Sequence, residues 1–290
     1  MKHVVILVLA CGCQDALDQR LAIVKEPRVL AIVAEPPEVR PGNDVMLTAL
    51  AGGPDGALEA VPAWSLCAAP KPPTEDNAVA DGCLADQVVA LGSAAAITAT
   101  VPTDACRTFG PDVASTGFRP RDPDPTGGYY QPVRADLAAL DAAFGFARIT
   151  CNLANAPGDV AQAYRTMYVA NTNPTLDPLS IDGAPSTTTV PASSDVRLVA
   201  SWPSDAVETF LYFDPDTQTL VTRRESMRVS WFATGGALAV DASAVAEDDP
   251  ARSVTTTWQV PEVAGPATIW LVLRDSRGGI ATQTIAVDVR

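Results

Sequence analysis

The sequence predicts a mainly β protein that contains two β-sandwich domains. Apolar and polar residues alternate in short runs, and 25 prolines and 19 glycines are spread along all 290 residues. This composition favours many short strands and turns over long helices. A chain of this length can bury two hydrophobic cores. We therefore expect one domain over residues 28–173 and a second over 174–290, with the boundary in the turn-rich sequence NTNP at 171–174.

The first domain opens with two predicted strands, over residues 29–33 and 44–50, on either side of a proline-rich bend. The sequence EPPEVRPGNDVMLTAL at 35–50 resembles the start of many bacterial immunoglobulin-like repeats. Trp64 follows at the position where such domains place a core tryptophan against the opposite sheet. The resemblance therefore implies that Trp64 is buried.

The rest of the first domain is less regular. Residues 67–130 are expected to form an insertion held by disulfides, because alternation lapses there except at 96–101. Apolar residues at helical spacing predict one short helix over 136–144, which would cover an open end of the sandwich. Strands over 148–153 and 164–169 are expected to complete this domain.

The second domain ends in the clearest element of the chain, a predicted hairpin over residues 257–290. Apolar residues alternate on both sides of the sequence RDSRGG at 274–279, whose polar residues and glycines suit a short turn. Earlier strands are expected over 196–202, 210–212, 220–222 and 229–231. The predicted core of this domain contains Trp231, Ile269, Leu271, Ile285 and Val287.

The residues around the last hairpin also carry a family resemblance. They follow the order Trp258, Pro261, Gly265 before the turn and Asp275, Gly278, Gly279 within it. This order resembles the C-terminal half of PKD-type and related bacterial immunoglobulin-like domains, over residues 227–290. The resemblance implies an immunoglobulin-like sandwich and does not specify an activity.

Four cysteines lie in the body of the chain, at Cys67, Cys83, Cys106 and Cys151. In an oxidising compartment an even set predicts disulfides, for which three pairings are possible. A metal site is disfavoured because these cysteines have no CxxC spacing and no histidine lies near them. Pairing of sequence neighbours, Cys67 with Cys83 and Cys106 with Cys151, closes the shortest loops and is the pairing we predict.

The first ten residues, MKHVVILVLA, are predicted to be a secretion signal, since a basic start precedes an apolar run far shorter than the ~20 residues of a spanning helix. The sequence VLAC at 8–11 resembles the lipobox of bacterial lipoproteins, which implies a lipid on Cys11, with Cys13 as the alternative. The leader is shorter than usual, so either the signal is short or the start codon is placed late. Residues 11–27 would form a tether.

The lipobox resemblance also implies a cellular location. Gly12 follows Cys11, where lipoproteins kept in the inner membrane of Gram-negative bacteria carry aspartate. We therefore expect lipid anchoring in the outer membrane, on its periplasmic or cell-surface side. Expected partners are the membrane, through that anchor, and an envelope protein or polysaccharide. A net charge of −14 disfavours nucleic acid.

Catalytic chemistry has little support in the residue types available. The single histidine is His3, in the leader, so serine or cysteine nucleophiles with a histidine base and histidine-ligated metals are excluded from the mature chain. The 34 acidic residues include no pair in a setting typical of a glycosidase. We expect no enzymatic activity, no catalytic residue and no cofactor.

One loop resembles part of a calcium site. Asp122, Asp124 and Thr126, followed by glycine, match the first half of a calcium-binding loop. Val133 stands where the second half would need a bidentate glutamate. We therefore expect a structural turn and no metal site.

Tyr129 and Tyr130 follow this loop and are candidates for stacking on a ligand, although adjacent strand residues face opposite ways. The sequence predicts a non-enzymatic lipoprotein that acts as an adhesive or scaffold module. The alternative is a carbohydrate- or ligand-binding module that uses loop aromatics. That alternative requires Tyr129, Tyr130 and Trp258 to be exposed and coplanar.

Overall fold

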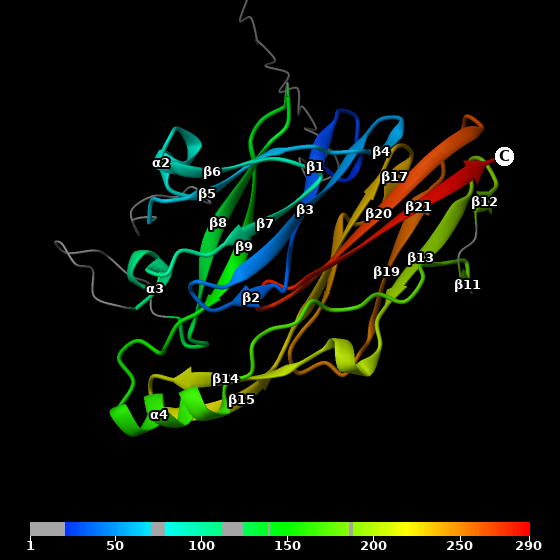
Figure 1. The fold of residues 1–290 in the computed structure, drawn as a ribbon. Helices are drawn as coiled ribbons and strands as arrows, with labels where there is room; N and C mark the ends of the chain where they lie inside the picture. The colour runs from blue at the N-terminus through cyan, green and yellow to red at the C-terminus, as the bar shows by residue number, and fades with distance from the viewer. Residues whose placement is uncertain (1–20, 71–78, 112–123, 139, 186–187) are drawn as a thin grey trace, which may run out of the picture.

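The computed structural model describes residues 21–70, 79–111, 124–138, 140–185 and 188–290. Two β-sandwiches lie side by side, the first drawn in blue to green and the second in yellow-green to red (Figure 1). The predicted fold class, a mainly β chain with two sandwiches and few helices, is confirmed. Within the described residues, no helix is long and apolar enough to cross a membrane.

The first sandwich packs two antiparallel-rich sheets over one core. One sheet contains β1 (Arg28–Glu35), β3 (Asp44–Gly53), β4 (Gly56–Leu58) and β7 (Ala96–Thr100). The other runs in the order β2 (Glu38–Val39), β9 (Ala143–Thr150), β8 (Gly128–Asp136), β5 (Ala63–Cys67) and β6 (Val88–Ser93). Trp64 is buried in the core between them, as expected, and its indole Nε1 donates to the Ala94 carbonyl at 2.9 Å.

The second sandwich has the same two-layer arrangement. One sheet runs β11 (Ala184–Pro185), β10 (Ser180–Ile181), β13 (Asp195–Ser201), β19 (Ser253–Gln259) and β17 (Ala237–Leu238). The facing sheet runs β12 (Thr189–Val190), β21 (Ile280–Val289), β20 (Gly265–Asp275), β16 (Met227–Ala233) and β18 (Ala242–Val245). The predicted hairpin is confirmed as β20–β21, with Ile269 opposite Ile285, and all five predicted core residues pack in or against one cluster.

A separate hairpin reaches from the second half of the chain to the first. It consists of β14 (Thr209–Asp214) and β15 (Thr219–Arg224), and it lies beside α4 (Gly158–Met167) at the lower edge of Figure 1. Phe213 of the hairpin, Tyr164 of α4 and Leu153 form a small buried cluster. The remaining short helical turns are η1 (Ser204–Ala206), α2 (Asp81–Leu84) and α3 (Ala105–Thr108).

The position of the short helix differs from the sequence prediction. Residues 136–144 form the end of β8, a loop and the start of β9, whereas the helix α4 includes residues 164–167 of a predicted strand. In the first segment, strand pairing outweighs local helical spacing, because Phe144 and Phe146 pair with Arg134 and Pro132 of β8. In the second, Ala161 and Tyr164 lie three residues apart and bury one helix face.

Two other predicted segments also differ. Residues 67–130 are not an insertion as a whole, because β6, β7 and the start of β8 belong to the sheets of the sandwich. The predicted tether, residues 11–27, includes residues that pack: the Val24 amide donates to the Ala233 carbonyl at 2.8 Å, and the Val24 side chain is buried. Ala22 packs in the core of the second sandwich, and Val24 packs in a separate cluster with Leu30 and Trp270.

Candidate functional site

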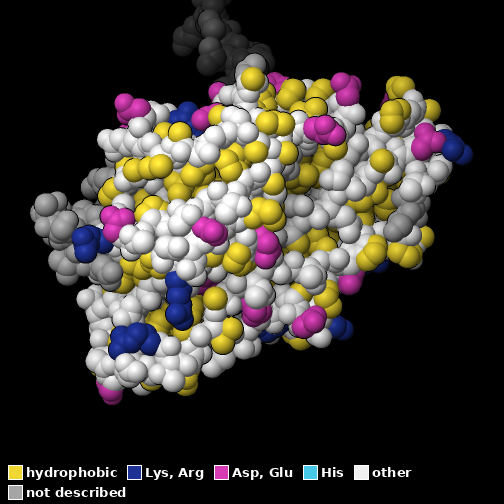
Figure 2. All heavy atoms as spheres, viewed as in Figure 1, with side chains coloured by type: hydrophobic (Ala, Val, Ile, Leu, Met, Phe, Trp, Pro, Cys, Tyr) yellow, Lys and Arg dark blue, Asp and Glu magenta, His cyan; other side chains and the backbone are white. Residues whose placement is uncertain are grey.

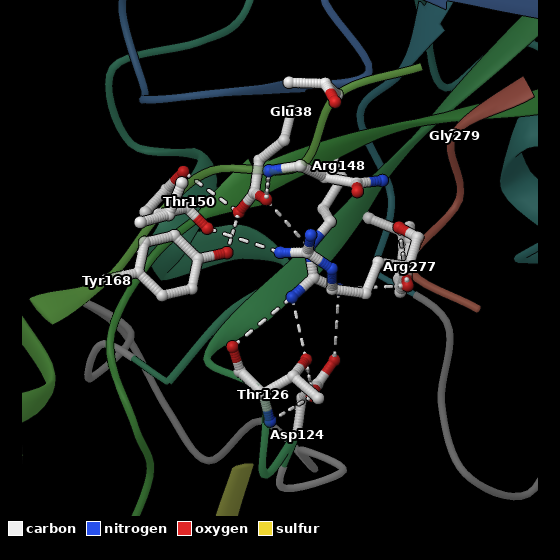
Figure 3. Close-up of polar contacts among 12 residues, drawn as sticks. Glu38, Asp124, Thr126, Arg148, Thr150, Tyr168, Arg277 and Gly279 are labelled. Carbon is white, nitrogen blue, oxygen red and sulfur yellow. Dashed lines mark hydrogen bonds and ion pairs between the residues drawn. The ribbon is translucent and has the colours of Figure 1, made fainter. Parts of the chain in front are cut away.

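A network of buried polar side chains lies where the two sandwiches meet (Figure 3). Two arginines form its centre, Arg148 on β9 of the first sandwich and Arg277 in the β20–β21 turn of the second. They are 1% and 2% exposed. Isolated buried charges are costly, so each arginine must be compensated by nearby carboxylates. We call this network the polar junction and define it by Glu38, Arg148, Asn171, Glu208, Glu225, Asp275 and Arg277.

Arg148 is paired with Glu38 of β2. Its Nε lies 3.2 Å from Glu38 Oε2, and its Nη2 donates to the Thr126 hydroxyl at 2.7 Å. Glu38 in turn accepts hydrogen bonds from the hydroxyls of Thr150, at 3.0 Å, and Tyr168. A Cβ on Gly128 would lie 2.0 Å from the Arg148 guanidinium, so only glycine at that position leaves room for it.

Arg277 is held by two carboxylates of the second sandwich. Its Nε and Nη2 each lie 2.8 Å from a carboxylate oxygen, of Glu225 and Glu208 respectively. Its backbone amide donates to Asp275 Oδ1 at 2.8 Å, which fixes the turn. Nη1 donates to the carbonyl of Val169, in the segment between the sandwiches, at 3.3 Å.

Asn171 connects the two halves of the polar junction. Its backbone amide donates to Glu38 Oε2 at 2.8 Å, and its side-chain Nδ2 donates to both carboxylate oxygens of Asp275, at 3.2 and 3.3 Å. A second connection runs through Tyr130, whose hydroxyl accepts from Arg148 Nη1 at 3.1 Å and donates to the Arg277 carbonyl at 3.3 Å. Each sandwich therefore supplies hydrogen-bond partners that the other needs.

Burial shifts the proton affinities of the polar junction. It raises the pKa of the Glu225 carboxyl to about 7; the charge of Asp275 adds to this rise and Arg277 opposes it. Burial also raises the pKa of Asp275. Burial is the largest single influence on the pKa of Arg148 and would lower it, but Glu38, Tyr130, Tyr168 and Asp124 together outweigh burial, so the pKa lies above its ordinary value. Arg148 therefore stays charged, while Glu225 takes up a proton near neutral pH.

The polar junction is suited to fixing geometry. Glu225 is 1% exposed, and its oxygens contact Arg277 and, at 2.9 Å, the backbone amide of Glu208. Charged groups that act on a substrate must reach it. Here the buried carboxylates contact protein groups, so the arrangement orients the two sandwiches relative to each other. On the face shown in Figure 2, acidic side chains lie singly among bands of apolar and neutral surface.

The predicted aromatic ligand site is not assembled as an exposed platform. Tyr129 is buried, and Trp258 is 0% exposed, with its Nε1 donating to the Gly235 carbonyl at 2.9 Å. Tyr130 is partly buried, and its hydroxyl contacts Arg148 of the polar junction. The three rings therefore do not offer the coplanar, exposed surface that the ligand-binding alternative requires.

The calcium-like loop is used in another way. Asp124 Oδ1 accepts from the Thr126 backbone amide at 2.8 Å, and Asp124 Oδ2 lies 4.0 Å from Arg148 Nη1. No group of three or more histidine, cysteine or acidic side chains is placed to hold a metal ion within the part of the chain that the structure describes. Asp122 lies outside the described residues, as do the predicted signal 1–10 and both candidate lipidation sites, Cys11 and Cys13.

The predicted disulfide pairing is confirmed. Cys67 is bonded to Cys83 and Cys106 to Cys151, with Cα atoms 5.3 and 5.6 Å apart. The first bond joins β5 to α2, and the second joins α3 to the residue after β9. Both therefore attach short helical turns to the first sandwich.

Sequence reasoning did not identify the polar junction. Arg148 lies between Ala147 and Ile149, which are buried in the core, so alternation predicts that its side chain points to solvent. On that outer face Arg148 contacts Glu38, Thr126 and Tyr130, and Tyr130 in turn contacts the β20–β21 turn of the second sandwich. A usable signal was the RDSRGG turn, where Asp275 and Arg277 stand two residues apart in a tight hairpin.

Comparisons with known proteins give no family. No protein-family model matches the chain, and no curated protein matches it either. Among solved structures, similarity was found to a superoxide reductase (neelaredoxin) from Ignicoccus hospitalis (10% identity, TM-score 0.26, 40% of this chain and 82% of that one). The Yersinia pseudotuberculosis adhesin InvE matches at 12% identity and TM-score 0.24, over 89% of this chain and 58% of that one.

A third structure, domains 4 and 5 of the S-layer protein SbsC, matches at 9% identity and TM-score 0.21, over 90% of this chain and 98% of that one. The functions named for these three proteins differ widely. TM-scores this low identify neither a shared fold nor a shared function, so the chain must be interpreted from its own contacts.

Proposed function

We propose that this chain is a non-enzymatic envelope or cell-surface lipoprotein whose two coupled sandwiches act as an adhesive or scaffold module. The observation that supports this proposal is the polar junction, in which the buried Arg148 and Arg277 are each paired with carboxylates of their own sandwich. Hydrogen bonds through Asn171 and Tyr130 link the two pairs across the contact. Domains joined by a small, wet interface usually move relative to each other. A buried, hydrogen-bonded junction favours one fixed orientation, which suits a module that transmits force or holds a partner at a defined distance.

The finer family assignment also belongs to this proposal. A PKD-type or related immunoglobulin-like domain over residues 227–290 would be a frequent component of bacterial surface proteins. We also propose a domain boundary near residue 174, which divides the chain into one domain over 28–173 and one over 174–290. Limited proteolysis tests this division: cleavage near 171–174 that releases two stable fragments supports it, and cleavage only at sites away from 171–174 contradicts it.

The proposed anchor is a lipid on Cys11, which would place the protein in the outer membrane, on the periplasmic or cell-surface side. Metabolic labelling with a radioactive fatty acid tests the anchor. The unaltered chain should be labelled, Cys11→Ala should be unlabelled and soluble, and Cys13→Ala should behave like the unaltered chain. Labelling of Cys11→Ala would move the lipid to Cys13, and an unlabelled parent protein would contradict the lipoprotein assignment.

The proposed partners are the membrane, through this anchor, and an envelope protein or polysaccharide. Crosslinking in whole envelopes, followed by purification in detergent, should recover the chain with a defined envelope component. The alternative, a carbohydrate-binding module built on Tyr129, Tyr130 and Trp258, has less support because Tyr129 and Trp258 are buried. If crosslinking recovers only the monomer in every membrane fraction, the adhesive or scaffold role is wrong.

A further inference from the structure

A cavity lies between the two sandwiches, beside the polar junction. Its volume is about 340 Å³, which falls at the small end of the range for ligand pockets. The first sandwich contributes strands β1, β8 and β9 to its walls, and the closing hairpin of the second sandwich contributes the rest. The side chains that matter here are Leu30, Tyr130, Phe144, Phe146, Arg274 and Ile280.

Arg274 is the unusual member of this lining. It is partly buried at the end of β20, and its guanidinium makes one long hydrogen bond, from Nη1 to the Ser230 hydroxyl at 3.5 Å. Among the residues that the structure describes, no carboxylate forms an ion pair with it. Burial, together with the neighbouring positive charge of Arg228, lowers its pKa. The guanidinium therefore bears a desolvation cost, and no carboxylate among the residues that the structure describes offsets it.

The other buried arginines show what this cation lacks. Arg148 and Arg277 are more deeply buried, and each has at least one carboxylate partner within 3.2 Å. A guanidinium presents a planar set of donors that matches the two oxygens of a carboxylate. An anion in the cavity, next to the Arg274 guanidinium, would give Arg274 the kind of ion pair that Arg148 and Arg277 already have.

The remaining lining determines what else the ligand must be. Phe146, at 39% exposed, packs edge-on against Tyr130 with ring centroids 6.1 Å apart, and Phe144, Leu30 and Ile280 add apolar surface. A chain with a net charge of −14 does not attract simple anions, so apolar contact must supply part of the affinity. The lining therefore favours a ligand with an acidic end and a flat apolar body.

We propose that this cavity binds a small carboxylate with an apolar or aromatic body, whose acid group pairs with Arg274 while its ring packs against Phe146. Such a site goes beyond the scaffold role and does not depend on the lipid anchor. It also gives Tyr130 a place in ligand binding that differs from an exposed stacking platform, because the ring lines an interdomain cavity.

Fluorine NMR of 4-fluorophenylacetate with the full chain tests this site. We expect a dissociation constant on the order of 1 mM, as is usual for a ligand of this size. The neutral analogue 4-fluorophenylacetamide should bind at least tenfold more weakly, since it cannot form the ion pair. Arg274→Gln should weaken binding of the acid at least tenfold and leave binding of the amide unchanged.

Arg228→Gln is the matched control, because Arg228 lies opposite Arg274 in the β16–β20 register but is exposed. It should change the affinity for the acid less than twofold. Equal binding of the acid and the amide to the unaltered chain would overturn the proposal, whether or not Arg274→Gln folds. So would an equal loss of affinity in the two arginine variants, or no binding of the acid at 10 mM, about tenfold above the expected constant.

Discussion

Two of the contacts that join the sandwiches are stabilised by different interactions. One is the polar junction around Arg148 and Arg277, and the other is an apolar contact around Trp270. In the apolar contact, Trp270 and Phe232 of the second sandwich pack with Leu30 and Leu50 of the first. Apolar burial contributes free energy roughly in proportion to the area removed from water, and it specifies no direction. Hydrogen bonds to buried charges do specify direction, but desolvation offsets most of their gain.

The difference suggests a division of roles. The apolar contact holds the sandwiches together, and the polar junction selects one orientation. Close approach supports the first role, since a Cβ on Gly52 would lie 2.8 Å from the Trp270 ring, so β3 can pack there only with glycine. Asn171 supports the second, because its hydrogen bonds reach Glu38 on one side and Asp275 on the other. Each role leads to a different mutant phenotype.

The largest effect is expected from Trp270→Ala. Removing a fully buried indole should lower the free energy of unfolding by roughly 3 to 5 kcal/mol. Because Trp270 faces the first sandwich, we expect calorimetry to show one melting transition for the parent protein and two for the variant, as coupling is lost. Leu271→Ala is the matched control, since Leu271 lies on the opposite face of β20, in the second core. It should cost roughly 2 to 5 kcal/mol and shift the melting transition without splitting it, because the contact between the sandwiches is intact. A single transition in both variants would show that the apolar contact is not what couples the sandwiches.

A somewhat smaller effect is expected from Arg148→Met. The change keeps apolar bulk but leaves the Glu38 carboxylate buried without its cation. Breaking a buried pair in this way should lower the free energy of unfolding by about 3 kcal/mol, measured by urea denaturation. Arg290→Met is the control, because its pair with Asp288 is exposed and should contribute within about 0.5 kcal/mol. Equal losses in both variants would contradict a special role for burial at Arg148.

The pH dependence of stability should follow Glu225. Its pKa of about 7 in the folded chain lies above the ordinary value of 4.5, so its contribution to stability is full below about pH 4.5 and is lost as pH rises through 7. Glu225→Gln mimics the protonated form. Between pH 5 and pH 8 the stability of this variant should therefore improve relative to the parent by about 2 kcal/mol. Parallel stability curves for the two proteins over this range would contradict the raised pKa.

Several elements were predictable because their signals are local. Alternation over β20 and β21, with glycines in the turn, was sufficient to predict the closing hairpin and its core. The even number of cysteines predicted the disulfides, and the shortest loops predicted their pairing. The helix over 136–144 was predicted wrongly, because Phe144 has helical spacing with Leu137 and Leu140 but pairs with Arg134 in the sheet. Local spacing cannot show which strand lies alongside.

The polar junction is a non-local feature, which explains why no sequence pattern indicated it. Glu38 and Arg148 lie 110 positions apart, and Asn171 bonds to Asp275 across 104 positions. Each of these side chains is polar on a strand face or in a turn, as it would be if it were exposed. They are buried because distant segments of the chain pack over them, such as Tyr168 over Glu38 and Asn171 against Asp275. A charged residue on the outer face of a strand can therefore be exposed to solvent or buried in a contact, and a single sequence does not distinguish the two.

The smallest expected change in stability, from Asn171→Ala, is the sharpest test of the division of roles. The variant keeps the backbone hydrogen bond to Glu38 but loses the side-chain bonds to Asp275, which retains two backbone donors. The free energy of unfolding should fall by only about 1 to 2 kcal/mol. Because the lost bonds are directional, spin labels on engineered cysteines at exposed Asp55 and Asp248 should nevertheless give a broader distance distribution. Asn152→Ala, outside the polar junction, should leave that distribution narrow. An unchanged distribution in Asn171→Ala would mean that the Asn171 side chain does not set the orientation of the sandwiches.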